Sequence, residues 1–297
     1  MYPRAFAYHR AGSVQEASTL LAQLGEGAKL LAGGQSLIPL MKLRLSAPTH
    51  LVDLNFIPGL SYVEEKDGEL HFGPLARHAQ IEDSVAAKKV PILYDCASGI
   101  ADVQVRNQGT IGGSLVEADP TGDWLPVLLT LDTTVRCLRG GGERSLPLGD
   151  FVSDAFTTVL APDELVREVV VKIPPANSGG AYLAFKRSAP VYATASVAVQ
   201  LSMQEGAVRD AAIALGAVGL VSTRIHEAEK FLAGQPLNSK TLNAAAEAAM
   251  STCDPQSDLR GSADHKRVLV GWLLKRAINI AARRSRGEPV EGGHVYA

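Results

Sequence analysis

The first 57 residues alternate apolar and polar positions in a pattern typical of a small α/β unit. Ser13 begins an S-x-x-E capping box, which predicts the start of a helix. Two short apolar segments, residues 29–32 and 50–54, predict buried strands, and residues 37–43 between them predict one or two helical turns. Four apolar residues are expected on one face of the first helix: Ala17, Leu20, Leu21 and Leu24.

The middle of the chain predicts a second unit built from hairpins and helices. An Ile-Pro-Gly sequence at residues 57–59 marks the boundary, so this unit is expected over residues 58–176. Asp67-Gly68 separates two short runs with strand character, which is a hairpin signal, and three glycines at residues 140–142 predict another hairpin. Pro91 suits the first position of a helix.

The pattern changes after residues 174–180, a stretch rich in Pro and Gly that predicts a linker. Strands are expected first and only helices after them, which predicts an α+β domain with an antiparallel sheet over residues 177–297. The whole chain is therefore expected to contain two N-terminal α/β subdomains, residues 1–57 and 58–176, and this C-terminal α+β domain. The expected strands are residues 182–186, 195–203 and 208–215, and the expected helices are residues 223–232, 239–249 and 263–284.

Composition and charge exclude several classes of function. The 297 residues are 46% hydrophobic and 20% charged, which is ordinary for a globular protein. A formal net charge of −2 and only 5% aromatic residues argue against a nucleic-acid-binding surface. No apolar stretch of about 18 residues occurs, so the sequence predicts no membrane span.

The three cysteines, Cys96, Cys137 and Cys253, are far apart and form no C-x-x-C motif. No zinc or iron–sulfur site is therefore expected in this chain. The same pattern predicts reduced thiols in a cytoplasmic protein. The N-terminal residues lack the apolar core of a signal peptide, which agrees with that location.

Two pairs of glycines are the strongest candidates for a binding site. The sequences AGGQS at residues 32–36 and TIGGS at residues 110–114 each follow an apolar run and precede a helical signal. Adjacent glycines permit positive φ angles and leave backbone N–H groups open to a ligand, and Ser36 is expected to cap the short helix behind it. Two such loops could bind a pyrophosphate despite the negative net charge. The alternative for each pair is an ordinary turn.

The sequence contains no familiar catalytic motif. It lacks G-x-G-x-x-G, a P-loop, a nucleophile elbow and H-E-x-x-H, and its seven histidines are scattered, so each is expected to be structural or exposed. If the protein is an enzyme, a bound cofactor is expected to supply the chemistry. Lys186 is either an ordinary lysine at a strand end or a cation facing the pyrimidine edge of a flavin, and Tyr192 either stacks on a ring or packs under its loop.

Three longer segments resemble one protein family. The sequences AGGQSLIPLMKLR, QVRNQGTIGGSLVEADPTGDWLPVLL and SADHKRVLVGWLLKRA are similar to those of the FAD-binding medium subunits of molybdenum hydroxylases, which include carbon monoxide dehydrogenase and xanthine dehydrogenases. The resemblance extends from Phe6 to about Gly287. It implies an oxidoreductase subunit whose two N-terminal subdomains are of the vanillyl-alcohol-oxidase-like type, with FAD between them and the C-terminal domain.

The resemblance also implies which residues bind FAD. The two glycine motifs would hold the pyrophosphate, Ile100 would make an apolar contact, and Asp123 and Lys186 would lie near the flavin. Val166 matches less securely than these, and Tyr192 matches the carbon monoxide dehydrogenase-like members. No catalytic or metal-binding residue is implied. The full cofactor-binding set is Leu31, Ala32, Gly33, Gly34, Gln35, Ser36, Leu37, Ile100, Thr110, Ile111, Gly112, Gly113, Ser114, Asp123, Val166, Lys186 and Tyr192.

The cofactor order of the family accounts for the absence of iron–sulfur cysteines. A large molybdopterin-binding subunit would hydroxylate the substrate, and a small subunit would carry two 2Fe-2S clusters. This chain would receive electrons on FAD and pass them to NAD, a quinone, a cytochrome or oxygen, in a dimer of heterotrimers located in the cytoplasm or at the inner face of the membrane. The alternatives are an autonomous flavin oxidoreductase of the same fold and a subunit that binds FAD only for assembly.

Overall fold

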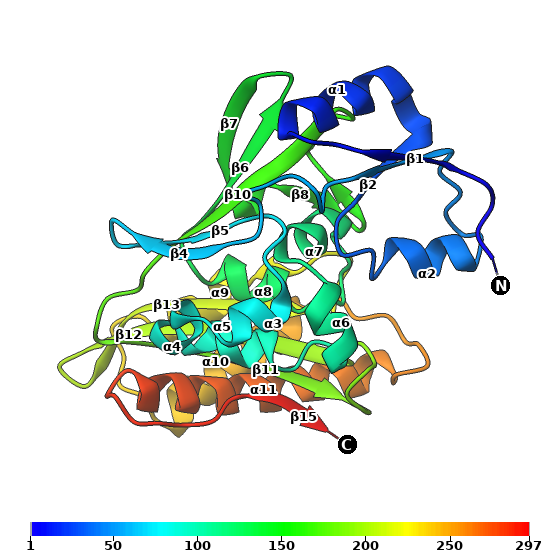
Figure 1. The fold of residues 1–297 in the computed structure, drawn as a ribbon. Coiled ribbons are helices and arrows are strands. Elements are labelled where there is room, and N and C mark those ends of the chain that lie inside the picture. Colours follow the sequence, from blue (N-terminus) through cyan, green and yellow to red (C-terminus); the bar gives the residue numbers. More distant parts are fainter. Residues whose placement is uncertain (1, 297) are drawn as a thin grey trace.

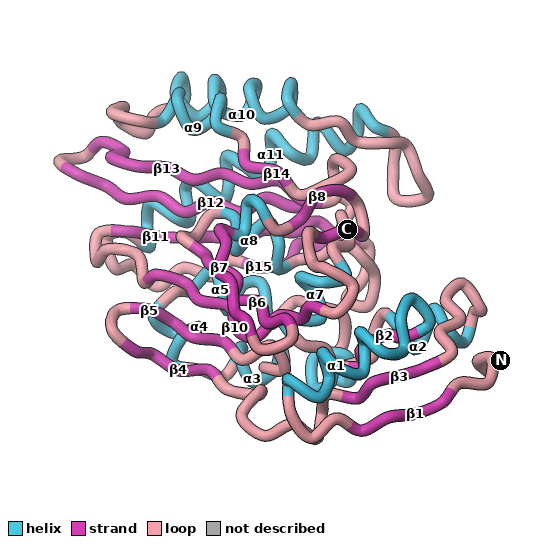
Figure 2. Tube along the Cα trace, turned by 90° about the horizontal axis from the view of Figure 1, so that it is seen from above, coloured by secondary structure: helices cyan, strands magenta, loops and turns pink. Residues whose placement is uncertain are grey.

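Three main sheets follow one another along the chain in the computed structural model, which describes residues 2–296 (Figure 1). The first sheet is parallel, the second is antiparallel, and the third is antiparallel except for one edge strand. Figure 2 shows the first sheet on the opposite side of the molecule from the C-terminal helices α9 and α10. This order of α/β elements followed by an α+β unit confirms the predicted fold class.

The N-terminal sheet has the strand order β1-β3-β2 and carries α1 between its first two strands in the chain. The Ser13 hydroxyl accepts a hydrogen bond from the Glu16 N–H at 3.1 Å, so the predicted N-cap is confirmed. The Glu16 carboxylate accepts from the Gly12 N–H at 2.7 Å, one residue before the expected capping-box partner. The elements are β1 (Ala7–Arg10), α1 (Val14–Leu24), η1 (Gly25–Gly27), β2 (Ala28–Leu31), α2 (Leu37–Lys42) and β3 (His50–Asp53).

The second sheet has the order β4-β5-β10-β6-β7. Both predicted hairpins are present, and Asp67 (φ 53°) and Gly68 (φ 80°) make the tight turn of the first. The helix predicted at Pro91 is also present. The strands and 3-10 turn are β4 (Val63–Lys66), β5 (Glu69–Phe72), β6 (Thr133–Arg139), β7 (Gly142–Pro147), η2 (Leu148–Asp150), β8 (Val152–Asp154), β9 (Thr157–Thr158) and β10 (Glu164–Lys172). The helices are α3 (His78–Glu82), α4 (Val85–Lys89), α5 (Pro91–Ala97), α6 (Val103–Gln108), α7 (Ile111–Glu117) and α8 (Trp124–Leu129).

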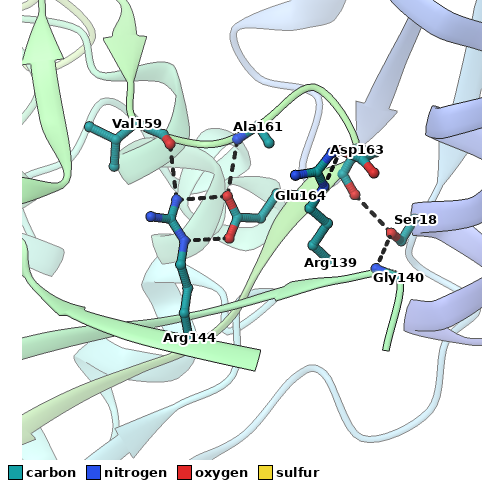
Figure 3. A network of polar contacts seen from close by, with 8 residues as sticks. All are labelled: Ser18, Arg139, Gly140, Arg144, Val159, Ala161, Asp163 and Glu164. Carbon is teal, nitrogen blue, oxygen red and sulfur yellow. Dashed lines mark hydrogen bonds and ion pairs between the residues drawn. The ribbon is translucent and has the colours of Figure 1, made fainter. Parts of the chain in front are cut away.

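Polar contacts join the first two sheets (Figure 3). The Ser18 hydroxyl on α1 donates to the Asp163 carbonyl at 2.8 Å and accepts from the Gly140 N–H at 2.9 Å. Arg144 on β7 makes two hydrogen bonds of 2.7 Å to the buried Glu164 carboxylate at the start of β10. The two Ser18 contacts therefore attach α1 to the second sheet, and the bidentate, charge-assisted Arg144–Glu164 pair links β7 to the start of β10 within that sheet.

The third sheet has the order β14-β13-β12-β11-β15 and is apolar on both faces. Along β11, Ala181 and Leu183 pack into the core beneath α11, whereas Tyr182 and Ala184 pack into the core of the second unit. This alternation follows from the two-residue period of a strand. The second and third units therefore share a buried interface built on β11. The elements are β11 (Ser178–Lys186), β12 (Ala195–Gln204), β13 (Ala207–Gly216), β14 (Thr223–Arg224), α9 (His226–Leu232), α10 (Ser239–Thr252), α11 (Ala263–Arg284) and β15 (Gly293–Tyr296).

Three expectations for the C-terminal part were wrong in detail. Residues 178–180 belong to β11 and not to the predicted linker. Glycine at residue 179 lets the strand pack closely against α11, because a Cβ there would collide with the Ala281 carbonyl. The segment at residues 223–224 is a short strand, so α9 begins later than predicted. The chain does not end in helices, because β15 pairs in parallel with β11. None of the described helices is long and apolar enough to span a membrane.

Candidate functional site

The first glycine pair forms the loop between β2 and α2. Leu31 ends the strand, residues 32–36 make the loop, and Leu37 is the first residue of the helix. Gly34 has a φ of 71°, a value that favours glycine. The Ser36 side chain makes no capping hydrogen bond, so the expected cap was wrong; its backbone is already helical (φ −95°, ψ −50°), which is not the extended conformation that a capping side chain needs.

The second glycine pair is helical, which differs from the expected strand-to-helix turn. Gly112 and Gly113 lie in the first turn of α7, and the segment before them is helix α6. Thr110 is buried and its hydroxyl accepts the Gly113 N–H at 3.1 Å, so a threonine cap starts the helix. A Cβ on Gly112 would lie 2.6 Å from the Pro74 carbonyl, which explains the need for glycine by close packing.

The two glycine motifs meet in the structure. A Cβ at Gly33 would collide with the Gln108 carbonyl and lie 2.8 Å from the Gly109 Cα, immediately before Thr110. A Cβ at Gly113 would lie 3.9 Å from the Ala32 Cβ. Segments separated by about seventy residues are therefore packed against each other, and the absence of a side chain at Gly33 is what allows them to approach.

Asn55 and Arg77, which the sequence analysis did not identify, connect these motifs. The Asn55 amide donates to the Ala32 carbonyl at 2.8 Å and to the Asp53 carboxylate at 2.7 Å. The Arg77 guanidinium donates to the Asn55 side-chain oxygen at 2.5 Å and to the Gln108 carbonyl. One arginine thus bridges the ends of β3 and α6. Asn55 follows the carboxyl end of a parallel strand, where ligand sites gather in open α/β sheets, and that rule could have identified it.

His78 extends the connection toward Asp123. Its backbone N–H donates to the Gly109 carbonyl at 3.2 Å, and its Nδ1 accepts the Trp124 indole N–H at 3.0 Å. Burial lowers the pKa of His78 to about 4, opposed in part by the Asp123 carboxylate. The ring is therefore neutral near pH 7 and can accept from the indole. This bond fixes the start of α8, where Asp123 lies.

Asp123 and Lys186 form a buried ion pair. The two side chains are 8% and 1% exposed, with 3.5 Å between Oδ2 and Nζ. The Lys186 ammonium also donates to the Gly99 carbonyl at 3.1 Å, and the Tyr182 hydroxyl donates to Asp123 Oδ1 at 2.6 Å. Asp123 precedes α8 but its side chain does not cap the helix, because the carboxylate is directed to these groups. A buried charge persists only when paired, so Lys186 is not an ordinary strand-end lysine.

The remaining predicted residues lie around this pair to different degrees. Ile100 directly follows Gly99 and is half-buried against the second core. Tyr192 is 53% exposed in the loop between β11 and β12. Val166 is buried in the core of the second unit, on the strand that packs against α7. Among residues 2–296, no group of three or more His, Cys, Asp or Glu residues could hold a metal ion.

Comparisons with known proteins find similarity over nearly the whole chain. Residues 4–175 match the FAD binding domain in molybdopterin dehydrogenase, and residues 180–281 match the CO dehydrogenase flavoprotein C-terminal domain. The 6-hydroxypseudooxynicotine dehydrogenase complex subunit alpha of Paenarthrobacter nicotinovorans is 38% identical over 288 residues, which are 96% of this chain and 97% of that protein. The carbon monoxide dehydrogenase medium chain of Hydrogenophaga pseudoflava is 36% identical over 285 residues, which are 96% of this chain and 99% of that protein.

A solved structure agrees with the sequence relatives. The structure of carbon monoxide dehydrogenase from Hydrogenophaga pseudoflava has a TM-score of 0.93 and 38% identity, and the match covers 96% of this chain and 99% of that chain. Identity at this level over nearly the full length of both chains confirms the family suggested by the sequence motifs. The chain belongs to the FAD-binding medium subunits of the molybdenum hydroxylases, and it is an oxidoreductase subunit that binds FAD.

Proposed function

We propose that this chain carries electrons in a molybdenum hydroxylase, from the 2Fe-2S clusters of a small subunit to an external acceptor. Bound FAD supplies the chemistry, since a flavin can take up electrons singly and release two. The residues present fit this cofactor: the two pairs of glycines carry no side chain at residues 33–34 and 112–113, and a cation and a carboxylate are buried together nearby.

The roles of individual residues follow from their positions. We assign the pyrophosphate to the two glycine motifs together with Leu31 and Leu37. Asp123 and Lys186 would orient the flavin ring, with Ile100 and Val166 as apolar neighbours and Tyr192 over the open side. The Tyr182 hydroxyl donates to Asp123 and holds its carboxylate in place, and the Lys186 charge would stabilise a reduced, anionic ring.

The observation that carries the proposal is the buried Asp123–Lys186 pair at the junction of the second and third units. Desolvating two charges is costly, and such a pair is often no more stable than apolar residues of the same size. Stability alone therefore does not explain why the ion pair is buried here. A bound redox cofactor whose charge changes on reduction gives a functional reason for the pair.

The proposed assembly contains a large molybdopterin-binding subunit and a small 2Fe-2S subunit, as a dimer of heterotrimers. Relatives named medium chain or FAD-binding subunit support this, among them the xanthine dehydrogenase FAD-binding subunit of Escherichia coli O157:H7. Within the chain, we propose subdomain boundaries near residues 57 and 176. The three segments that these boundaries define contain the first, second and third main sheets in that order.

The test is to purify the complex and to ask whether electrons from the hydroxylation reach the flavin. The complex should contain FAD that is released on denaturation and that is reduced after the iron–sulfur clusters. The isolated chain should bind FAD but should not oxidise the substrate. Turnover by the isolated chain would identify an autonomous flavin oxidoreductase, and a flavin that is never reduced would indicate a role in assembly alone.

A further inference from the structure

The last strand follows both matched family regions, which cover residues 4–175 and 180–281. β15 lies beside β11 (Figure 1) and pairs with it in parallel. The register places His294 opposite Ala184 and Tyr296 opposite Lys186. The segment before it is tied down by Arg284, which donates to the Val290 carbonyl at 2.9 Å. The strand therefore holds a fixed position beside the end of β11 that carries Lys186.

His294 reaches the Asp123–Lys186 pair from this strand. Its side chain is 3% exposed, and its Nε2 lies 4.0 Å from Asp123 Oδ1. The ring meets the Tyr182 ring edge-on, with 5.7 Å between centroids. It also covers Gly99, where any Cβ would collide with the imidazole. Gly99 is the residue whose carbonyl accepts from Lys186.

Both ring nitrogens of His294 are buried, and neither has a hydrogen-bond partner among residues 2–296. Burial lowers the pKa of this ring to about 4, and the Asp123 carboxylate offsets part of this effect. The Cys96 carbonyl also offsets part of it, although it is not placed to form a hydrogen bond with the ring. A neutral imidazole offers one donor and one acceptor. Buried polar side chains are nearly always hydrogen-bonded in folded proteins, so two unpartnered nitrogens in one ring indicate a partner outside the part of the chain that the structure describes.

We propose that His294 is a further FAD-binding residue, carried into the site by the C-terminal strand, and that its ring nitrogens hydrogen-bond to the bound cofactor. The inference rests on FAD binding by this chain. It assigns a cofactor contact to residues beyond the family's matched regions. It also explains why a polar ring, rather than an aliphatic side chain, fills the space over Gly99.

The test is His294→Leu, which keeps an apolar side chain of similar volume and removes both nitrogens. In the full-length chain without FAD, this variant should be at least as stable as the natural chain in urea, because it removes unpaired buried polar atoms. Its Kd for FAD, measured by quenching of flavin fluorescence, should rise by about tenfold. His294→Gln, which restores a donor and an acceptor, should recover part of the affinity. Val295→Ala is the control on the same strand, and it should leave the Kd unchanged.

The outcomes separate this inference from the proposed function. A natural chain that binds no FAD would overturn both. A natural chain that binds FAD, with His294→Leu binding equally well, would overturn only the role of His294. A chain ending at Glu288 lacks the strand and should lose at least as much affinity as His294→Leu. Tighter binding by the shortened chain would show that the strand competes with FAD, and would also overturn the inference.

Discussion

At the scale of single residues, the site depends on charges that cannot be removed one at a time. Lys186 and Asp123 are paired in the interior, and each satisfies a further partner, the Gly99 carbonyl and the Tyr182 hydroxyl. Removing one member of a buried pair leaves the other charge without compensation, which costs more than the pair itself contributes. If these residues bind FAD as proposed, stability and cofactor binding are linked through the same atoms.

Replacing Lys186 by Met should lower the free energy of unfolding by about 3 kcal/mol, because Asp123 is left buried and unpaired. It should also weaken FAD binding and lower the potential of the bound flavin, since a cation that favours the reduced ring is lost. Urea denaturation and spectroelectrochemistry measure these effects. The Lys186→Met, Asp123→Asn double variant is the control: it should recover much of the stability, and strictly additive losses would argue against a coupled pair.

Two buried histidines should make stability depend on pH. Burial lowers the pKa of both His78 and His294 to about 4 from the ordinary 6.5. Between these values the unfolded state binds more protons, so stability is fully present above about pH 6.5 and is lost as the pH falls toward 4. The free energy of unfolding in urea should thus be lower at pH 5 than at pH 7. His78→Asn should reduce this difference and the exposed His226→Asn should not; an unchanged difference in His78→Asn would contradict the assignment.

At the scale of elements, the proposed FAD site lies at the contact between the β2–α2 loop and the start of α7. The approach of these two elements requires a residue without a Cβ at Gly33. The bridge through Arg77 and Asn55 then fixes the separation of the two segments. The site is therefore sensitive to changes that leave each element intact but move them apart.

The substitution Gly33→Val should abolish FAD binding, because its side chain would collide with the Gln108 carbonyl. The third unit should stay folded, so near-normal circular dichroism is expected together with a colourless protein. Gly149→Val is a matched control, since a Cβ at Gly149 meets no atom within 4 Å. Full FAD occupancy in the Gly33 variant would refute the role given to this loop.

The Arg77→Lys variant tests the bridge. A lysine keeps the charge but lacks the planar fork that reaches the Asn55 side chain and the Gln108 carbonyl at the same time. The Kd for FAD should rise by about tenfold, which corresponds to about 1.4 kcal/mol. Arg286→Lys changes an exposed arginine in the same way and should leave the affinity unaltered, whereas equal effects of the two variants would argue against the bridge.

At the scale of the whole molecule, the features that could be predicted from the sequence are those that depend on residues close together in the chain. The cap at Ser13, the Asp67-Gly68 hairpin and the bounds of α11 depend on local preferences, and the structure confirms them. β15 was missed because its four residues gain their strand conformation only by pairing with β11, more than one hundred residues earlier in the chain. The Arg77 bridge was missed for the same reason, since it joins three separate segments.

The measurement that bears most directly on the central claim is rapid mixing of the complete complex with its substrate, followed at the absorption bands of the iron–sulfur clusters and the flavin. We expect the clusters to be reduced first and the flavin afterwards, with reoxidation of the flavin by the external acceptor. A complex carrying Gly33→Val should reduce its clusters but should not deliver electrons to the acceptor. Delivery at the natural rate without bound FAD, or a flavin that stays oxidised during turnover, would contradict the proposed role in electron transfer.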